Sequence, residues 1–84
     1  MAQVTILLPF RNAARTLDAA IASIAEQSFG DWHLLLIDNA STDDGPAIAA
    51  RWARTDGRIT LLTEPTIGIA HALNAGLAHS TLTL

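Results

Sequence analysis

Hydrophobic residues along this chain occur in short unbroken runs, separated by longer stretches in which apolar residues recur every three or four positions. Pro9 ends the first run, and a polar, acidic stretch that begins at Asp38 ends the second. Unbroken apolar runs bounded by turn residues are typical of strands buried on both faces, as in parallel sheets covered by helices. We therefore expect strands at residues 4–8, 32–38 and 59–63.

The stretches between these runs have helical periodicity, because their apolar residues fall on one face when spaced by three or four positions. We expect helices at residues 15–27, 46–54 and 68–79, and a turn at Gly30 just past the first helix. In the last helix, Ile69, Leu73 and Leu77 lie on one apolar stripe. The alternating residues 81–84 predict a fourth strand.

This alternation predicts an α/β fold with a doubly wound, Rossmann-like parallel sheet, in the order β-α-β-α-β-α-β. The usual strand order for such a sheet is 3-2-1-4, with a ligand crevice between the carboxyl ends of the first and fourth strands. The loops after the first, second and fourth strands are then expected to converge on one ligand. A chain of 84 residues makes at most one small domain, so residues 1–84 are treated as a single unit.

Composition narrows the functional classes. The net charge is −3 and the five basic residues are scattered arginines, which argues against a nucleic-acid partner. The absence of cysteine excludes disulfides and thiolate metal sites. No apolar run approaches the roughly 20 residues that cross a bilayer, and the N-terminus lacks a signal-peptide pattern, so we expect a cytoplasmic protein.

Polar residues at the tip of the second strand are the first candidates for chemistry. The Gly-rich fingerprints of nicotinamide-binding domains and phosphate-loop hydrolases are absent. Asp38 and Asn39 offer hydrogen bonds to a base edge or to ribose hydroxyls. Alternatively, Asp38 caps the following loop by accepting hydrogen bonds from backbone N–H groups. Spacing leaves both interpretations open.

Other polar residues are weaker candidates for a metal or ligand-binding site. Asp43 and Asp44 precede a helix, where acidic side chains favour the positive end of the dipole, and this favours a capping role over a metal pair. Arg11 either faces an anionic phosphate or is a surface residue. Asn74 and Gly76 have poor helix propensity, which indicates a packing or site reason for their presence. The histidines show no metal-ligand spacing, and no nucleophile–base pair is evident, so no catalytic residue and no metal ligand is predicted.

Four stretches, in this order along the chain, are similar to motifs of one enzyme family. Residues 4–12 resemble an opening strand that ends in Pro-x-Tyr-Asn or Pro-x-Arg-Asn, and residues 23–29 resemble the end of its first helix. Residues 36–43 resemble its V-D-[DN]-x-S-x-D tip, and residues 68–77 its G-x-x-x-A-x-N-x-G helix. Together they resemble the N-terminal part of a family 2 glycosyltransferase with the GT-A fold.

The resemblance implies binding of a nucleotide sugar, most often a UDP-sugar, and glycosyl transfer to the hydroxyl of a saccharide or lipid-linked acceptor, usually with inversion. The donor-site residues that it implies are Pro9, Phe10, Arg11, Asn12, Asp38, Asn39, Ser41, Gly68 and Asn74. Two positions depart from the usual pattern. Arg11 replaces a Tyr, although a guanidinium plane can also stack. Asn39 replaces the second acid, which changes the donors and acceptors offered to a base.

In the family, an Asp-x-Asp motif that holds a divalent cation (Mg or Mn), and the general base, come later than Leu84. We therefore expect these 84 residues alone not to catalyse transfer. The alternatives are a non-catalytic module that binds a nucleotide or a partner, and a truncated gene product. We also expect self-association through an exposed sheet edge, and a longer family member could associate with a membrane.

Overall fold

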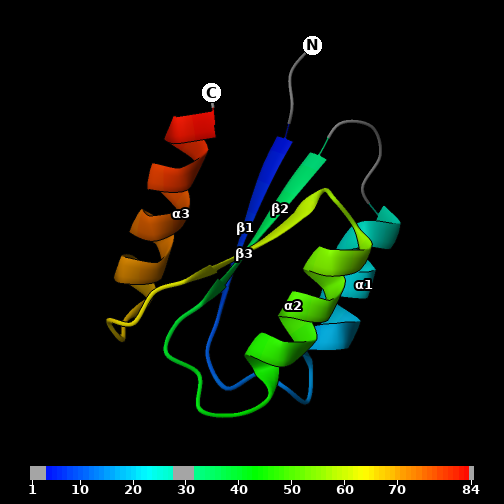
Figure 1. Cartoon of the computed structure of the whole chain (residues 1–84), viewed down its shortest axis with the longest axis horizontal. Helices are drawn as coiled ribbons and strands as arrows, with labels where there is room; N and C mark the ends of the chain where they lie inside the picture. The colour runs from blue at the N-terminus through cyan, green and yellow to red at the C-terminus, as the bar shows by residue number, and fades with distance from the viewer. Residues whose placement is uncertain (1–3, 28–31, 84) are drawn as a thin grey trace.

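The computed structural model describes residues 4–27 and 32–83 of the chain. The elements of this part follow one another as β1 (Val4–Phe10), α1 (Leu17–Gln27), β2 (Trp32–Asp38), α2 (Gly45–Thr55), β3 (Ile59–Thr63) and α3 (Ile69–Thr83) (Figure 1). The predicted α/β class with a Rossmann-like parallel sheet is confirmed. Gly30, expected just past the first helix, lies outside the described residues.

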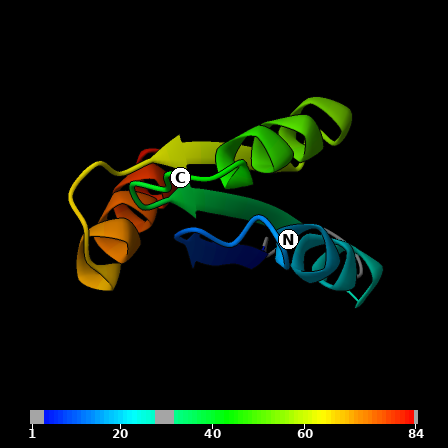
Figure 2. The ribbon, with the colours of Figure 1, turned by 90° about the horizontal axis from the view of Figure 1, so that it is seen from below.

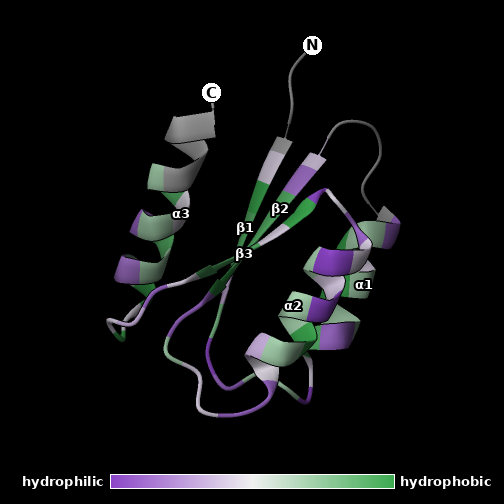
Figure 3. Cartoon of the chain, in the orientation of Figure 1, coloured by the Kyte–Doolittle hydropathy of each residue, from purple (hydrophilic) through white to green (hydrophobic). Residues whose placement is uncertain are grey.

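The three described strands form a parallel sheet with β2 in the centre. Leu36 of β2 pairs with Leu8 of β1 on one side and with Leu61 of β3 on the other. The predicted order 3-2-1 is therefore confirmed for these strands. β2 has a neighbour on each side, and its residues 34–37 form an unbroken apolar run. In Figure 3 the apolar colour lies along the strands, between the helices on the two faces of the sheet.

One face of the sheet packs against α1 and α2 (Figure 2). Successive side chains of a strand point to opposite faces, so Trp32, Leu34 and Leu36 of β2 share this face. Their burial against the helices contributes about 1.5–3 kcal/mol for each large side chain to this hydrophobic core. The remaining buried members of the cluster are Phe10, Leu17, Ile21, Ala49 and Ile59.

The opposite face packs against α3 through small residues. Ala72 is fully buried, and a Cβ atom placed on Gly76 would lie 2.9 Å from Cδ1 of Ile37 and 3.1 Å from Cδ2 of Leu7. Only glycine allows the helix to approach the sheet this closely. This packing explains a residue of poor helix propensity in the middle of α3.

The apolar stripe of Ile69, Leu73 and Leu77 does not face the sheet. Ile69 is 67% exposed and Leu77 is 56% exposed, whereas Leu73 is half-buried. Close contact requires small side chains at the interface, so the helix turns Ala72 and Gly76 inward and the larger stripe outward.

The predicted fourth strand is wrong within the described residues. Residues 80–83 continue α3, which ends at Thr83 rather than near His79, and Leu84 lies outside the described part. Each residue added to a formed helix gains one backbone hydrogen bond, and no Gly or Pro stops α3 here. The helix therefore continues through residues 81–83 despite their alternating polar and apolar pattern. None of the helices described is long and apolar enough to cross a membrane.

Candidate functional site

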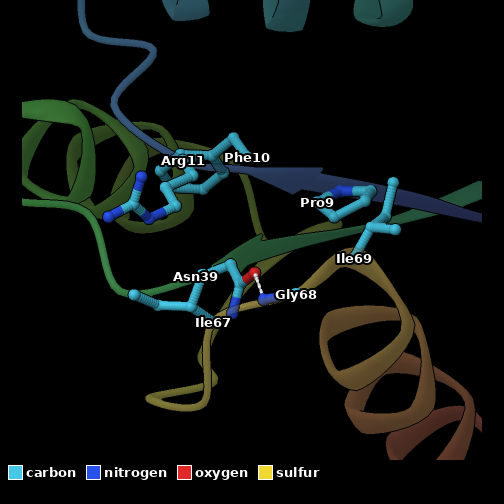
Figure 4. A pocket seen from close by; sticks show the side chains of 7 residues that line it. All are labelled: Pro9, Phe10, Arg11, Asn39, Ile67, Gly68 and Ile69. Carbon is cyan, nitrogen blue, oxygen red and sulfur yellow. Dashed lines mark hydrogen bonds between the residues drawn. The ribbon is translucent and has the colours of Figure 1, made fainter.

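A pocket of about 240 Å³ opens where the strands end (Figure 4). It is lined by Pro9, Phe10, Arg11, Asn39, Ile67, Gly68 and Ile69. Five of the nine predicted donor-site residues therefore meet at one place, namely Pro9, Phe10, Arg11, Asn39 and Gly68.

The parallel sheet brings these residues together. Phe10, Asp38 and Thr63, the last residues of the three strands, are in register across the sheet. The segments that follow them therefore emerge at one edge, which is the lower edge in Figure 1 and the edge where open α/β sheets bind ligands. The expected crevice beside a fourth strand is replaced here by a pocket between the ends of β1 and β2 and the segment that joins β3 to α3.

Asn39 forms part of the pocket wall and is itself only 5% exposed. Its side-chain nitrogen donates to the carbonyl oxygens of Glu64 (3.1 Å) and Thr66 (2.7 Å). Its side-chain oxygen accepts from the backbone N–H of Gly68 at 2.9 Å (Figure 4). Both amide hydrogens are thus engaged by the protein itself, so the carboxamide holds the β3–α3 segment against the tip of β2.

Asp38 is buried and does not line the pocket. Its Oδ1 accepts a hydrogen bond from the backbone N–H of Ser41 at 3.0 Å. This is the loop-capping interaction, one of the two interpretations that the sequence left open. The turn that it closes contains Ala40 with a φ of 60°, a left-handed conformation that is uncommon for alanine.

Asn12 and Ser41 join the β1–α1 loop to the β2–α2 loop. The side-chain oxygen of Asn12 accepts from the backbone N–H of Thr42 (2.7 Å) and from its hydroxyl (3.2 Å). The backbone N–H of Asn12 donates to Oγ of Ser41 at 3.0 Å. Asn12 has a φ of 53°, which asparagine tolerates better than most residues. These two predicted donor-site residues therefore fix the loops beside the pocket.

Asp43 ties the same two loops to the start of α2. Its Oδ1 accepts from the N–H of Gly45 at 2.9 Å and its Oδ2 from the N–H of Ala14 at 3.0 Å. These bonds, the one from Gly45 first, lower the pKa of the Asp43 carboxyl. The role at a helix start agrees with the sequence interpretation. Within residues 4–27 and 32–83, no three Asp, Glu, His or Cys side chains come together as a metal-ligand group.

Arg11 and Asn74 differ in their relation to the pocket. Arg11 lines it, is exposed, and makes no hydrogen bond or ion pair with another described residue. Asn74 is exposed on α3 and is not among the lining residues. Sequence reasoning missed Ile67 and Ile69 as lining residues. Their position on either side of Gly68 was the available signal.

Comparison with known proteins gives a consistent result. The sequence profile of glycosyl transferase family 2 matches residues 5–83. A putative glycosyltransferase, EpsE of Bacillus subtilis, is 38% identical over 81 residues, which cover 94% of this chain and 29% of that protein. The Escherichia coli protein WfgD, a UDP-Glc:alpha-D-GlcNAc-diphosphoundecaprenol beta-1,3-glucosyltransferase, is 35% identical over 79 residues, which cover 93% of this chain and 30% of that protein.

A solved structure is similar as well. The mannosyltransferase PcManGT from Pyrobaculum calidifontis, in complex with GDP-Man and Mn2+, superposes with a TM-score of 0.82 at 36% sequence identity. The match covers 90% of this chain and 24% of that one. This chain therefore spans less than a third of the length of each of these relatives.

Proposed function

Because this chain belongs to glycosyl transferase family 2, we propose that its pocket binds the nucleotide of a sugar donor, for glycosyl transfer to an acceptor hydroxyl. The supporting observation is the pocket at the carboxyl edge of the sheet, where an arginine with no hydrogen-bond or ion-pair partner among the described residues stands beside apolar walls. A guanidinium group in this setting can pair with a diphosphate or stack on a base.

The size of the pocket supports binding of only a part of the donor. Ligand pockets usually measure about 300–1,000 Å³, and this one measures about 240 Å³. We assign it to the base and the adjoining ribose rather than to the whole nucleotide sugar. Pro9 and the isoleucines beside Gly68 supply apolar contact, and Arg11 lies at the rim.

We propose UDP-sugars as the donor class and GDP-sugars as the competing class. The E. coli relative is named for a UDP-glucose donor, and the archaeal structure holds GDP-mannose. The archaeal structure also holds Mn2+, which supports a divalent cation (Mg or Mn) in the reaction of the family. The described part of this chain offers no three-residue ligand set for that cation.

Calorimetric titration with UDP, GDP and ADP tests the proposal. We expect UDP to bind most tightly, and Arg11→Ala to weaken its binding about tenfold, because a charge-assisted contact is lost. Arg54→Ala is the matched control, since Arg54 is exposed in the last turn of α2 and does not line the pocket. Absence of binding by all three nucleotides, or equal weakening by both substitutions, would reject the proposal.

We further propose that the 84 residues bind the nucleotide without transferring sugar. The sequence contains no Asp-x-Asp motif, which carries the cation in the family that it resembles. Incubation with a UDP-sugar, Mn2+ and a set of saccharide and lipid-linked acceptors tests this point. Metal-dependent release of UDP by the 84-residue polypeptide would overturn it.

A further inference from the structure

The carboxamide of Asn39 bridges two parts of the chain that are 25 to 29 residues apart. We propose that Asn39 is a positioning residue for the donor site, acting as an amide clamp. The clamp fixes residues 64–68 over the tip of β2 and thereby forms one wall of the pocket. The inference rests on the proposed function only for its second measurement, the affinity for nucleotide.

The clamp is made by three hydrogen bonds from one planar group. Two hydrogens on one nitrogen reach different carbonyl oxygens, those of Glu64 and Thr66, while the oxygen accepts from Gly68. Residues 64–68 belong to no regular element, because β3 ends at Thr63 and α3 begins at Ile69. Two further bonds support the start of the segment. The backbone N–H of Glu64 donates to the carbonyl oxygen of Asp38 at 2.8 Å, and the N–H of Thr66 donates to Oε2 of Glu64 at 2.8 Å.

The arrangement requires an amide and not a carboxylate. Asparagine carries both donors and an acceptor, whereas an ionised aspartate carries acceptors only. Asn39→Asp would still offer an acceptor to Gly68 but would place a carboxylate oxygen against two carbonyl oxygens, and this repulsion would displace residues 64–68 from the tip of β2. Asn39 itself is only 5% exposed, so the new carboxylate would be buried there and the two carbonyl groups would lose the donor that faces them. The residue type at position 39 therefore decides whether the segment is held closed.

The held segment carries pocket residues. Ile67, Gly68 and Ile69 line one side of the pocket. Pro9 and Arg11, at the end of β1, line it as well. Figure 4 shows the residues of β1 facing this segment, with the bond between Asn39 and Gly68 at its base. Release of the clamp would free this wall while leaving the sheet and its core intact.

Hydrogen exchange measured by NMR tests the clamp directly. In the wild-type protein, the carboxamide protons of Asn39 should exchange slowly, in contrast to those of the exposed Asn74. In Asn39→Asp, the N–H groups of Thr66 and Gly68 should exchange at least about tenfold faster, while those of β1 and β2 stay unchanged, because the opening is local.

Asn12→Asp is the matched control for the exchange measurement. It makes the same chemical change, but Asn12 uses its side-chain oxygen as the acceptor for Thr42, and its side-chain nitrogen donates to no described residue. Exchange in residues 64–68 should be unchanged in this variant. Two outcomes for Asn39→Asp would overturn the clamp: faster exchange in all strands, or no increase in exchange in residues 64–68.

Nucleotide affinity provides the second measurement. Titration with UDP should show binding at least about tenfold weaker for Asn39→Asp than for wild type. The amide hydrogen exchange of β1 and β2 should be the same in both proteins. Locally faster exchange with unaltered affinity would reject the positioning role. If the wild-type protein binds no nucleotide, the proposed function fails, and the exchange data still decide whether the clamp exists.

Discussion

Gly68 lies at the base of the pocket with a backbone φ of 137°, a conformation that residues with a Cβ atom rarely adopt. An added Cβ would also lie 3.2 Å from Cδ2 of His71. We expect Gly68→Ala to lower the free energy of unfolding by about 1–3 kcal/mol, the usual cost of a strained backbone position. Urea denaturation measures this change.

The control for this substitution is Gly57→Ala. Gly57 has no heavy atom within 4 Å of its added Cβ and is not among the glycines with positive φ. Replacing such a glycine stabilises a protein by about 0.4–1 kcal/mol through the unfolded state. Equal losses of stability at the two positions would contradict the strain argument.

The carboxylate of Asp43 makes a pH-dependent contribution to the fold. Backbone N–H groups of Gly45 and then Ala14 lower its pKa below the ordinary value of 3.8. Its stabilisation is therefore complete above that value and is lost as the pH falls through the lower pKa of the folded state. Asp43→Asn should be less stable than wild type at about pH 7 and should lose less stability on acidification to about pH 3.

Chemical denaturation at the two pH values measures the difference. Asp44→Asn serves as the control, since Asp44 is exposed and makes no side-chain capping bond at the start of α2. An acid dependence that is identical in wild type and Asp43→Asn would show that this carboxylate does not contribute.

Sequence reasoning places Asp38 and Asn39 in the fold better than it describes their contacts. Asp38 and Asn39 were placed at the carboxyl tip of a strand because an apolar run followed by polar residues is a local signal. The partners of Asn39 lie in residues 64–68, and nothing local indicates that its amide bonds their backbone. Long-range hydrogen bonds of this kind follow from tertiary structure and not from spacing.

At the scale of the elements, α3 depends on the small side chain at position 76. Gly76→Val should lower the free energy of unfolding by about 1–3 kcal/mol, because extra methyl groups would overpack the contact with Ile37 and Leu7. Ala78→Val is the matched control on the exposed side of α3 and should cost only its helix propensity, about 0.5 kcal/mol. Thermal or urea unfolding that ranks the two substitutions equally would contradict the packing account.

The helix faces show where periodicity is sufficient and where it fails. In α1, Leu17 and Ile21 are buried in the core, because the stripe of large residues is also the face that packs. In α3, Ala72 and Gly76 make the contact, and hydrophobic spacing assigns them little weight. A sequence pattern can identify an amphipathic helix, but the distance of closest approach decides which face is buried.

At the scale of the whole molecule, the open edges of the sheet are the main liability. In the described sheet, β1 and β3 each pair only with β2, so each leaves one row of backbone N–H and C=O groups without a strand partner. Such edges promote pairing with another chain. The edge of β1 is the longer one, with seven residues against five in β3.

We therefore expect the 84-residue polypeptide to self-associate through β1 as its concentration rises. Thr5 is exposed on this strand, and Thr5→Lys should shift the equilibrium toward monomer, because lysine on an edge strand opposes strand addition. Thr63→Lys makes the same change at an exposed position on β3 and should have a smaller effect. Sedimentation velocity over a range of concentrations measures the association. A wild-type chain that stays monomeric throughout would show that the edge of β1 is protected, and a larger effect of Thr63→Lys would assign the contact to β3.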